Sequence, residues 1–193
     1  MAPKNTTRRG VAGVVLAAGG GTRFDGPTHK LLAPFRGRPV VSWVLDAVVA
    51  AGFDEVYLVT GSVDLSAVTP DGVLVIHATD WADGQAHTLQ AAKRQAEKDD
   101  LEAMVVGLGD QPMVPTSAWR SVGASAGPIV TAAFDGERRP PVKFHRSVWQ
   151  HLPLTGDEGA RTLFAARPDL VSEIACTGNP FDIDTAEDLA RWS

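Results

Sequence analysis

The feature that most constrains this chain is an apolar run, residues 11–17, which is soon followed by three consecutive glycines, residues 19–21. A short apolar run bounded by glycine is typical of a buried strand rather than a helix. Glycines at the C-terminal end of a strand let the backbone turn tightly and bring N–H groups close to a ligand. Because Arg23 and Lys30 follow, the stretch predicts a site for a strongly anionic ligand, most simply a triphosphate.

Two familiar phosphate-binding patterns do not match this stretch. The P-loop spacing G-x-x-x-x-G-K-[ST] is absent, and the residues that follow the glycines, Thr22, Arg23 and Phe24, do not fit G-x-G-x-x-G. A glycine-rich turn with solvated basic residues accounts equally well for the glycines alone. The two cations, together with acidic residues further along the chain, favour the ligand site.

Length and charge limit the class of protein. A chain of 193 residues suits one α/β domain, for which we expect residues 11–193, and the polar residues 1–10 are expected to form a disordered leader. The leader lacks the apolar segment of a signal peptide. The net charge of −5 argues against a nucleic-acid partner, which requires a basic face.

Cysteine content and hydropathy exclude two further classes. Cys176 is the only cysteine, so neither a disulfide framework nor a cysteine-based metal site is expected. No apolar run approaches the ~20 residues of a membrane span. A cytoplasmic protein that does not act at a membrane is the simplest expectation.

Strand and helix patterns alternate along the chain. This order predicts a right-handed crossover and a mostly parallel sheet, that is, a three-layer, Rossmann-like α/β fold with helices on both faces. Ligands of such sheets bind beyond the carboxyl ends of the strands, so Gly19 and Gly61 belong to one binding edge. The expected strands are residues 11–17, 55–60, 73–77, 103–108, 129–134, 140–144 and 171–175. One expected helix begins at Pro39, and a second follows residues 80–90 and ends near Asp99. Further helices are expected to begin at Pro115, Ser147, Gly156 and Thr185.

A carboxylate follows the strand expected to lie at the centre of the sheet. Asp110 stands in the sequence Gly109-Asp110-Gln111-Pro112, directly after residues 103–108. The geometry that brings Gly19 to the binding edge brings Asp110 there too, and Mg²⁺ usually takes one or two carboxylates plus substrate phosphates. An Asx-type turn after the strand is the alternative for this motif taken alone.

Two more carboxylates, Asp182 and Asp184, lie near the C-terminus. In an extended segment, residues two positions apart point to the same side. Paired carboxylates on one side are poor core residues and good partners for a divalent cation. Thr185 and Asp188 then fit a capping box that begins the terminal helix.

Several of these motifs resemble one family. LAAGGGTRF…KLL is similar to the signature LAAGxSxRMGxxKLL of the nucleotidyltransferases that act on molybdopterin, and most similar to the CTP:molybdopterin cytidylyltransferases. Thr22 replaces the usual serine, and Phe24-Asp25 stands where Met-Gly is common. GDQP, GDEGAR and DIDTAEDL are similar to the family's GDxP, GDxGAR and DIDTPEDL, and residues 81–89 are similar to W-A-x-G-M-x-x-S-L.

The resemblance implies a nucleotidyltransferase fold and a role for each matching residue. The implied catalytic residues are Arg23, Lys30 and Asp110. Those implied to bind the nucleotide are Leu16, Ala17, Ala18, Gly19, Gly20, Gly21, Thr22, Arg23, Lys30, Gly61, Gly84 and Thr88. Those implied to hold Mg²⁺ are Asp110 and Asp184, with Asp182 as a third candidate. Those implied to bind the acceptor are Gln111, Lys143 and Arg161.

The family implies a reaction and its partners. CMP would pass from CTP to the phosphate of molybdopterin cofactor with release of pyrophosphate, and a molybdoenzyme would receive the product. Three alternatives stay open: a relative that uses GTP or a sugar phosphate, a nicotinamide-dependent oxidoreductase, and a non-catalytic carrier of the cofactor. Against the oxidoreductase, Thr60-Gly61-Ser62 stands where a ribose-binding acidic residue is expected.

Overall fold

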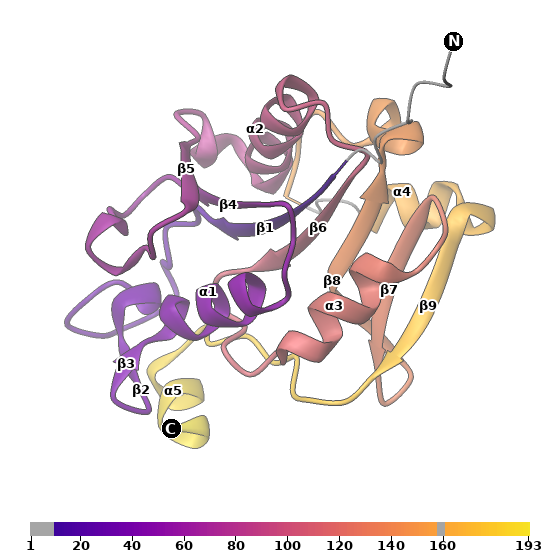
Figure 1. Ribbon diagram of the computed structural model, residues 1–193. Helices are drawn as coiled ribbons and strands as arrows, with labels where there is room; N and C mark the ends of the chain where they lie inside the picture. Colours follow the sequence, from indigo (N-terminus) through magenta and orange to yellow (C-terminus); the bar gives the residue numbers. More distant parts are fainter. Residues whose placement is uncertain (1–9, 158–160) are drawn as a thin grey trace, which may run out of the picture.

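A seven-stranded sheet forms the centre of the molecule in the computed structural model, which describes residues 10–157 and 161–193 (Figure 1). The strand order is β5-β4-β1-β6-β8-β7-β9, so β6 is the central strand, as predicted. The strands are β1 (Val11–Ala17), β4 (Glu55–Thr60), β5 (Val73–His77), β6 (Ala103–Leu108), β7 (Ile129–Phe134), β8 (Glu137–His145) and β9 (Val171–Cys176).

The sheet is mostly parallel, which confirms the predicted fold class. Strands β5, β4, β1 and β6 run parallel, and β9 runs parallel to β7. Strand β8 is antiparallel to both β6 and β7. The turn between β7 and β8 is Asp135-Gly136, with φ values of 50° and 82°. Two positive φ values suit the right-handed twist of a hairpin, which explains why Asp-Gly predicts one.

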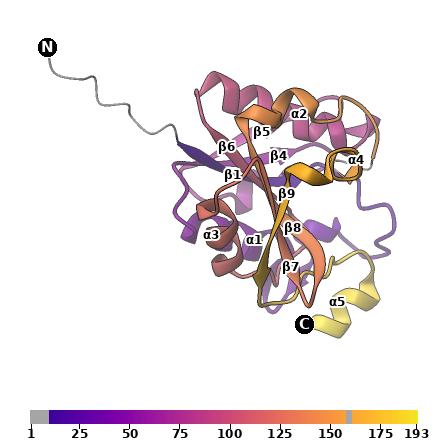
Figure 2. The ribbon, with the colours of Figure 1, turned by 90° about the vertical axis from the view of Figure 1, so that its right-hand side faces the viewer.

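Helices cover both faces of the sheet, so the fold has three layers (Figure 2). On one face α1 and α3 share a hydrophobic cluster with Val15 of β1, and on the other α2 and α4 share a cluster with the neighbouring Leu16. All seven residues of β1 are buried, because helices cover the strand on both faces. This burial explains why the sequence of β1 is apolar throughout. The helices are α1 (Val40–Ala50), α2 (Gln85–Lys98), α3 (Thr116–Ala124), α4 (Arg161–Ala166) and α5 (Ala186–Trp192).

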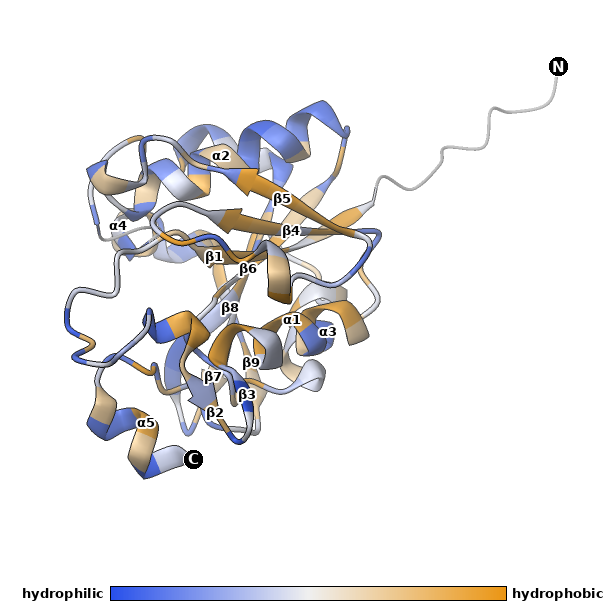
Figure 3. Ribbon diagram, turned by 90° about the vertical axis from the view of Figure 1, so that its left-hand side faces the viewer, coloured by the Kyte–Doolittle hydropathy of each residue, from blue (hydrophilic) through white to orange (hydrophobic). Residues whose placement is uncertain are grey.

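The apolar character of β4 and β5 and the polar residues of α2 are visible in Figure 3. One close contact between layers depends on a glycine: a Cβ on Gly107 of β6 would lie 2.4 Å from the Trp119 ring of α3. No helix in the described part of the chain is long and apolar enough to cross a membrane.

The two ends of the described chain compare differently with the sequence-based expectation. Of the predicted leader, residues 1–9 lie outside the described residues, whereas the carbonyl of Gly10 accepts a hydrogen bond from the N–H of Glu102. At the other end α5 begins with the predicted capping box of Thr185 and Asp188. It lies beside a short hairpin, β2 (Pro34–Phe35) and β3 (Arg38–Pro39), that the sequence does not predict because its strands have two residues each.

Candidate active site

A cavity of about 350 Å³ opens at the carboxyl ends of β1 and β6, where the sequence predicts the ligand site. We call it the first pocket. The glycine loop after β1, the 3-10 segment η1 (Lys30–Leu32), the segment η3 (Trp81–Asp83) and the first turn of α2 form its walls. The predicted residues that line it are Leu16, Ala17, Ala18, Gly19, Gly20, Gly21, Thr22, Arg23, Lys30, Gly84, Thr88, Asp110 and Asp184.

Hydrogen bonds from neighbouring segments hold the glycine loop in place. The carbonyl of Gly19 accepts from Ser62 Oγ at 2.8 Å and from His29 Nε2 at 3.1 Å. His29 Nδ1 accepts from the N–H of Leu31, so the ring proton is on Nε2. Burial lowers the pKa of His29, against the raising effect of its bond to Gly19, and the neutral ring therefore acts as a fixed donor. The sequence analysis missed His29, although it directly precedes Lys30.

Four charged side chains meet at the mouth of this loop. The ammonium of Lys30 lies 2.6 Å from Asp110 Oδ2 and 2.9 Å from Asp184 Oδ1. The guanidinium of Arg23 lies 3.0 Å from Asp184 Oδ2. Burial alone would lower the pKa of Lys30, but the two carboxylates outweigh burial and raise that pKa above its ordinary value. Lys30 is therefore a charged ammonium shared by two carboxylates.

The Asp110 carboxylate has the properties expected of a metal ligand. Its second oxygen, Oδ1, is buried and has no hydrogen-bond partner. A buried oxygen without a partner is costly, and coordination of a cation would satisfy it. Within residues 10–157 and 161–193, no three His, Cys, Asp or Glu side chains gather around one point. Two carboxylates completed by phosphate and water oxygens fit Mg²⁺, which rarely has an all-protein shell.

Asp182 and Asp184 do not take equivalent positions. The N–H of Ile183 donates to the carbonyl of Asp110 at 2.9 Å, which holds Asp184 beside Asp110. The Asp182 carboxylate instead accepts from Gln111 Nε2 at 2.8 Å and borders a second cavity. Residues 182–184 form an irregular segment rather than a strand, and within it Asp184 borders the first pocket whereas Asp182 borders the second. Burial is the largest cause that raises the pKa of Asp182, and the charge of Asp110 adds to it.

The second pocket, of about 310 Å³, adjoins the first, and the two share Leu16, Gln85 and Leu108. Its floor is apolar, and the rings of Phe144 and Phe164 stack with their centroids 6.3 Å apart. The other apolar residues of its lining are Leu89, Val106, Pro140 and Val142.

Three arginines border the second pocket. Arg138 pairs with Glu173 and Arg139 with Glu137. Arg161, a predicted acceptor residue at the start of α4, makes no ion pair within the described part of the chain. Residues 158–160 of the predicted GDEGAR motif lie outside the described residues. A guanidinium without an ion-pair partner among the described residues, beside apolar side chains, suits a ligand that combines a flat ring with an anionic group.

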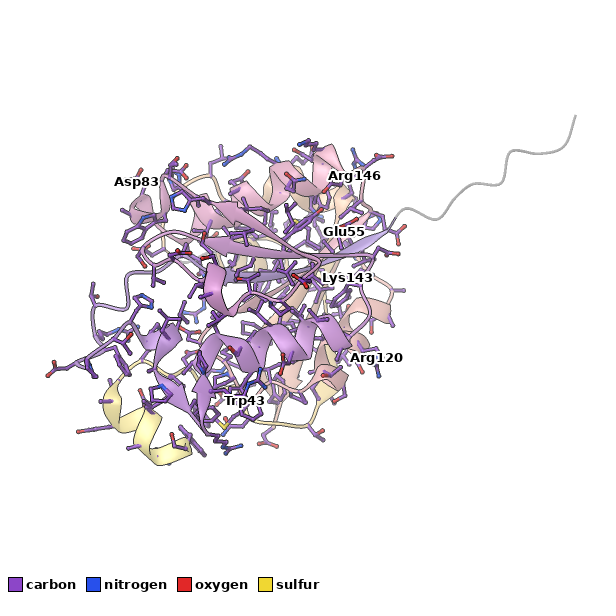
Figure 4. The ribbon with its side chains drawn as sticks, turned by 60° about the vertical axis from the view of Figure 1, so that its left-hand side comes forward. Trp43, Glu55, Asp83, Arg120, Lys143 and Arg146 are labelled. Carbon is purple, nitrogen blue, oxygen red and sulfur yellow. The ribbon has the colours of Figure 1, made fainter. Side chains whose placement is uncertain are left out.

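Lys143 is a correction to the predicted acceptor residues. Its ammonium is buried and donates to the carbonyls of Gly123 at 3.2 Å and Ser125 at 2.9 Å, near the end of α3. Because side chains alternate along a strand, Val142 and Phe144 reach the second pocket and Lys143 faces the opposite layer. In Figure 4 Lys143 lies on the side of Arg120, far from Asp83 of η3.

Gly61 is a second correction, because it does not border the first pocket. A Cβ at this position would lie 2.5 Å from the side chain of Trp81, so Gly61 provides the space in which the indole lies. Trp81 itself lines the pocket, together with two other residues that the sequence analysis left out, Gln85 and Asp157. The W-A-x-G resemblance was the sequence signal that marked Trp81.

The fold and this pocket define an α/β protein with a cationic glycine loop beside two carboxylates. The family comparison agrees: residues 13–171 match the model of the MobA-like NTP transferase domain. The chain belongs to this family.

Two proteins, one of them represented by two crystal structures, are similar to this chain over nearly its whole length. Nicotine blue oxidoreductase of Paenarthrobacter nicotinovorans is 32% identical, and the match covers 94% of this chain and 95% of that protein. The crystal structure of Rv0371c from Mycobacterium tuberculosis is 30% identical with a TM-score of 0.83, over 96% of this chain and 98% of that one. The structure of Rv0371c in complex with manganese has a TM-score of 0.77 and 31% identity, with the same coverage.

Proposed function

We propose that this chain is a nucleotidyltransferase that moves CMP from CTP to the phosphate of molybdopterin cofactor and releases pyrophosphate. The observation that carries the proposal is the cluster of Lys30, Arg23, Asp110 and Asp184 at the mouth of the glycine loop. Such a cluster combines cations for phosphate oxygens with carboxylates for a divalent cation. Mg²⁺ as the metal and the cytoplasm as the location belong to the same proposal.

The chain's own groups would bind and orient the triphosphate. Residues 19–22 line the pocket, and their N–H groups, together with Arg23 and Lys30, would neutralise the triphosphate and the departing pyrophosphate. Mg²⁺ held by Asp110 and Asp184 would supply further charge neutralisation at the α-phosphate. The attacking phosphate is already an anion, so no general base is needed, and orientation accounts for much of the rate.

The second pocket is the proposed acceptor site. It adjoins the first pocket, so a ring on the Phe144–Phe164 floor lies within reach of the carboxylate cluster. Arg161 would bind an anionic group of the acceptor, and Gln111 would act by holding Asp182 in the wall of the second pocket. A molybdoenzyme that takes up the dinucleotide product would be the next partner.

The test is pyrophosphate release by the purified protein with Mg²⁺ and molybdopterin cofactor, measured in parallel with CTP, GTP and UTP. Release that requires both CTP and the cofactor would support the proposal. Release with GTP but not with CTP would assign GTP as the nucleotide substrate. Release with a sugar phosphate in place of the cofactor would assign a sugar phosphate as the acceptor. No release with any pair, while the protein still binds the cofactor, would favour a carrier.

The 32% identity to nicotine blue oxidoreductase, over nearly the whole of both chains, favours a second candidate. On this reading the chain reduces a flat conjugated molecule with electrons from a nicotinamide dinucleotide. The end of β4 argues against this candidate. Dinucleotide-binding folds usually place there a carboxylate that binds the ribose, but in this chain β4 ends at Thr60, and the nearby Ser62 donates a hydrogen bond to the glycine loop. Oxidation of NADH or NADPH in the presence of an acceptor dye, without pyrophosphate release from CTP, would establish this function instead.

A further inference from the structure

The Lys30 ammonium lies between the two carboxylates that are proposed to hold the metal. Its side chain is 12% exposed, and those of Asp110 and Asp184 are 18% and 24% exposed. The three groups therefore form a half-closed ion cluster in the wall of the first pocket, rather than a solvated surface pair. A cluster of this kind responds strongly to added charge, because solvent screens it incompletely.

Three of the four carboxylate oxygens in this cluster already contact a cation. Lys30 contacts one oxygen of each carboxylate, and Arg23 contacts the second oxygen of Asp184. The remaining oxygen, Oδ1 of Asp110, is buried and has no hydrogen-bond partner among the residues that the structure describes. A divalent cation that approaches this cluster alone would meet an ammonium where it needs oxygen lone pairs.

The charges of the cluster cancel, since two cations face two carboxylates. If a metal ion displaced Lys30 from an otherwise empty pocket, the ammonium would lose both carboxylates that contact it in a half-closed site, which is unfavourable. A triphosphate changes this balance, because its oxygens give Lys30 and Arg23 new partners in the same pocket. Release of the carboxylates and binding of the phosphates are then one exchange of partners.

We propose that Lys30 is an exchangeable counter-ion that occupies the metal position until a triphosphate binds. The site then takes a divalent cation together with a nucleoside triphosphate and discriminates against the bare cation. This inference rests on the proposed metal-dependent chemistry of the first pocket and adds the order in which that pocket is filled. By linkage, the metal increases triphosphate affinity by the same factor as the triphosphate increases metal affinity.

The test measures binding of Mn²⁺ by electron paramagnetic resonance, without and with α,β-methylene-CTP, which is not cleaved. In the unchanged protein the analogue is expected to tighten Mn²⁺ binding by about 5- to 150-fold, the usual range for coupled sites. Lys30→Met removes the charge and keeps most of the side-chain volume. It is expected to tighten binding of bare Mn²⁺ by a similar factor and to abolish most of the coupling.

Two further variants serve as controls. Lys93→Met removes a lysine from an ion pair with Glu97 on α2, and we expect its Mn²⁺ binding to match that of the unchanged protein. Lys30→Arg keeps the positive charge, and we expect it to keep weak binding of the bare ion. Circular dichroism of each variant checks that the chain is folded.

The proposal is overturned if bare Mn²⁺ binds equally well with and without the analogue in the unchanged protein, or if folded Lys30→Met binds bare Mn²⁺ no more tightly. These outcomes are distinct from failure of the proposed function. Coupled binding of Mn²⁺ and the analogue without pyrophosphate release would support the counter-ion role of Lys30 and contradict the proposed transfer reaction. Mn²⁺ binding in neither condition would overturn both.

Discussion

The two pockets lie side by side at one edge of the sheet and are built from opposite kinds of surface. The first is bordered by glycines and by charged groups that pair with one another, such as Lys30 with Asp110. The second has an apolar floor with stacked phenylalanines and an arginine, Arg161, that has no ion-pair partner in the described part of the chain. The first pocket is suited to a charged ligand whose groups can replace the ion pairs within the pocket. The second is suited to a ligand with a ring that packs against apolar side chains.

This difference gives a criterion for testing the two sites separately. Changes in the first pocket should alter turnover and nucleotide affinity, whereas changes in the second should alter acceptor affinity and leave the nucleotide unaffected. A variant that affects both equally would show that the pockets act as one site.

The largest effect is expected from Asp110→Asn, which keeps the side-chain shape and removes the charge proposed to hold the metal. Turnover should fall by about 10²- to 10³-fold, the usual cost of losing one electrostatic contact in a transition state. The measurement is pyrophosphate release at saturating CTP. Asp169→Asn, which affects an exposed pair with Arg167, is the matched control. An unchanged kcat in folded Asp110→Asn would contradict the metal assignment.

A smaller effect in the same pocket is expected from Lys30→Ala. Loss of one charged contact to a phosphate costs about 1.5–3 kcal/mol, so CTP affinity in the presence of metal should fall by about tenfold or more. Isothermal titration with the non-cleaved analogue measures this affinity. Lys93→Ala on α2 should leave it unchanged. Full affinity in folded Lys30→Ala would remove Lys30 from the nucleotide site.

Arg161→Ala tests the second pocket. Because its guanidinium has no ion-pair partner in the described residues, its removal should cost little stability and should raise the KM for the acceptor by about tenfold. The KM for CTP should not change. Arg167→Ala, at the position directly after α4 and paired with Asp169, is the control. A change in the KM for CTP alone would reassign Arg161 to the first pocket.

Gly61→Ala probes the wall behind the first pocket. The added methyl group would lie 2.5 Å from Trp81, so the indole or the loop must move. Overpacking of this kind costs about 1–3 kcal/mol, which urea unfolding measures, and nucleotide affinity should fall with it. If the clash with Trp81 is the cause, Gly61→Ala should cost much less in a Trp81→Ala background. An equal cost in both backgrounds would exclude the clash.

The smallest effect is expected outside both pockets, at Tyr57, whose hydroxyl donates to Asp99 Oδ2 at 2.6 Å. This bond is the largest cause that lowers the pKa of Asp99. A lowered carboxyl pKa adds stability above the unfolded pKa of about 3.9, and that stability is lost as pH falls through the folded pKa. Urea unfolding should therefore show a gap between Tyr57→Phe and the unchanged protein at pH 7 that narrows in acid. A gap that widens in acid would contradict this reason.

Local signals in the sequence predicted much of the fold. The all-apolar run of β1, the Asp135-Gly136 hairpin and the Thr185 capping box each depend on a few neighbouring residues, and each forms as expected. The placement of Asp110 at the binding edge was predictable for a related reason, since the carboxyl ends of parallel strands meet at one edge.

Tertiary structure decided what no local pattern contains. Lys30 meets Asp110 across 80 positions and Asp184 across 154, and the backbone bond from Ile183 to Asp110 selects Asp184 over Asp182. The register of β8 turns Lys143 away from the second pocket. Sequence by itself determined which residues could do the chemistry. Only packing between distant segments decided which of them meet, because the direction of a side chain depends on the strand register and the neighbouring layer.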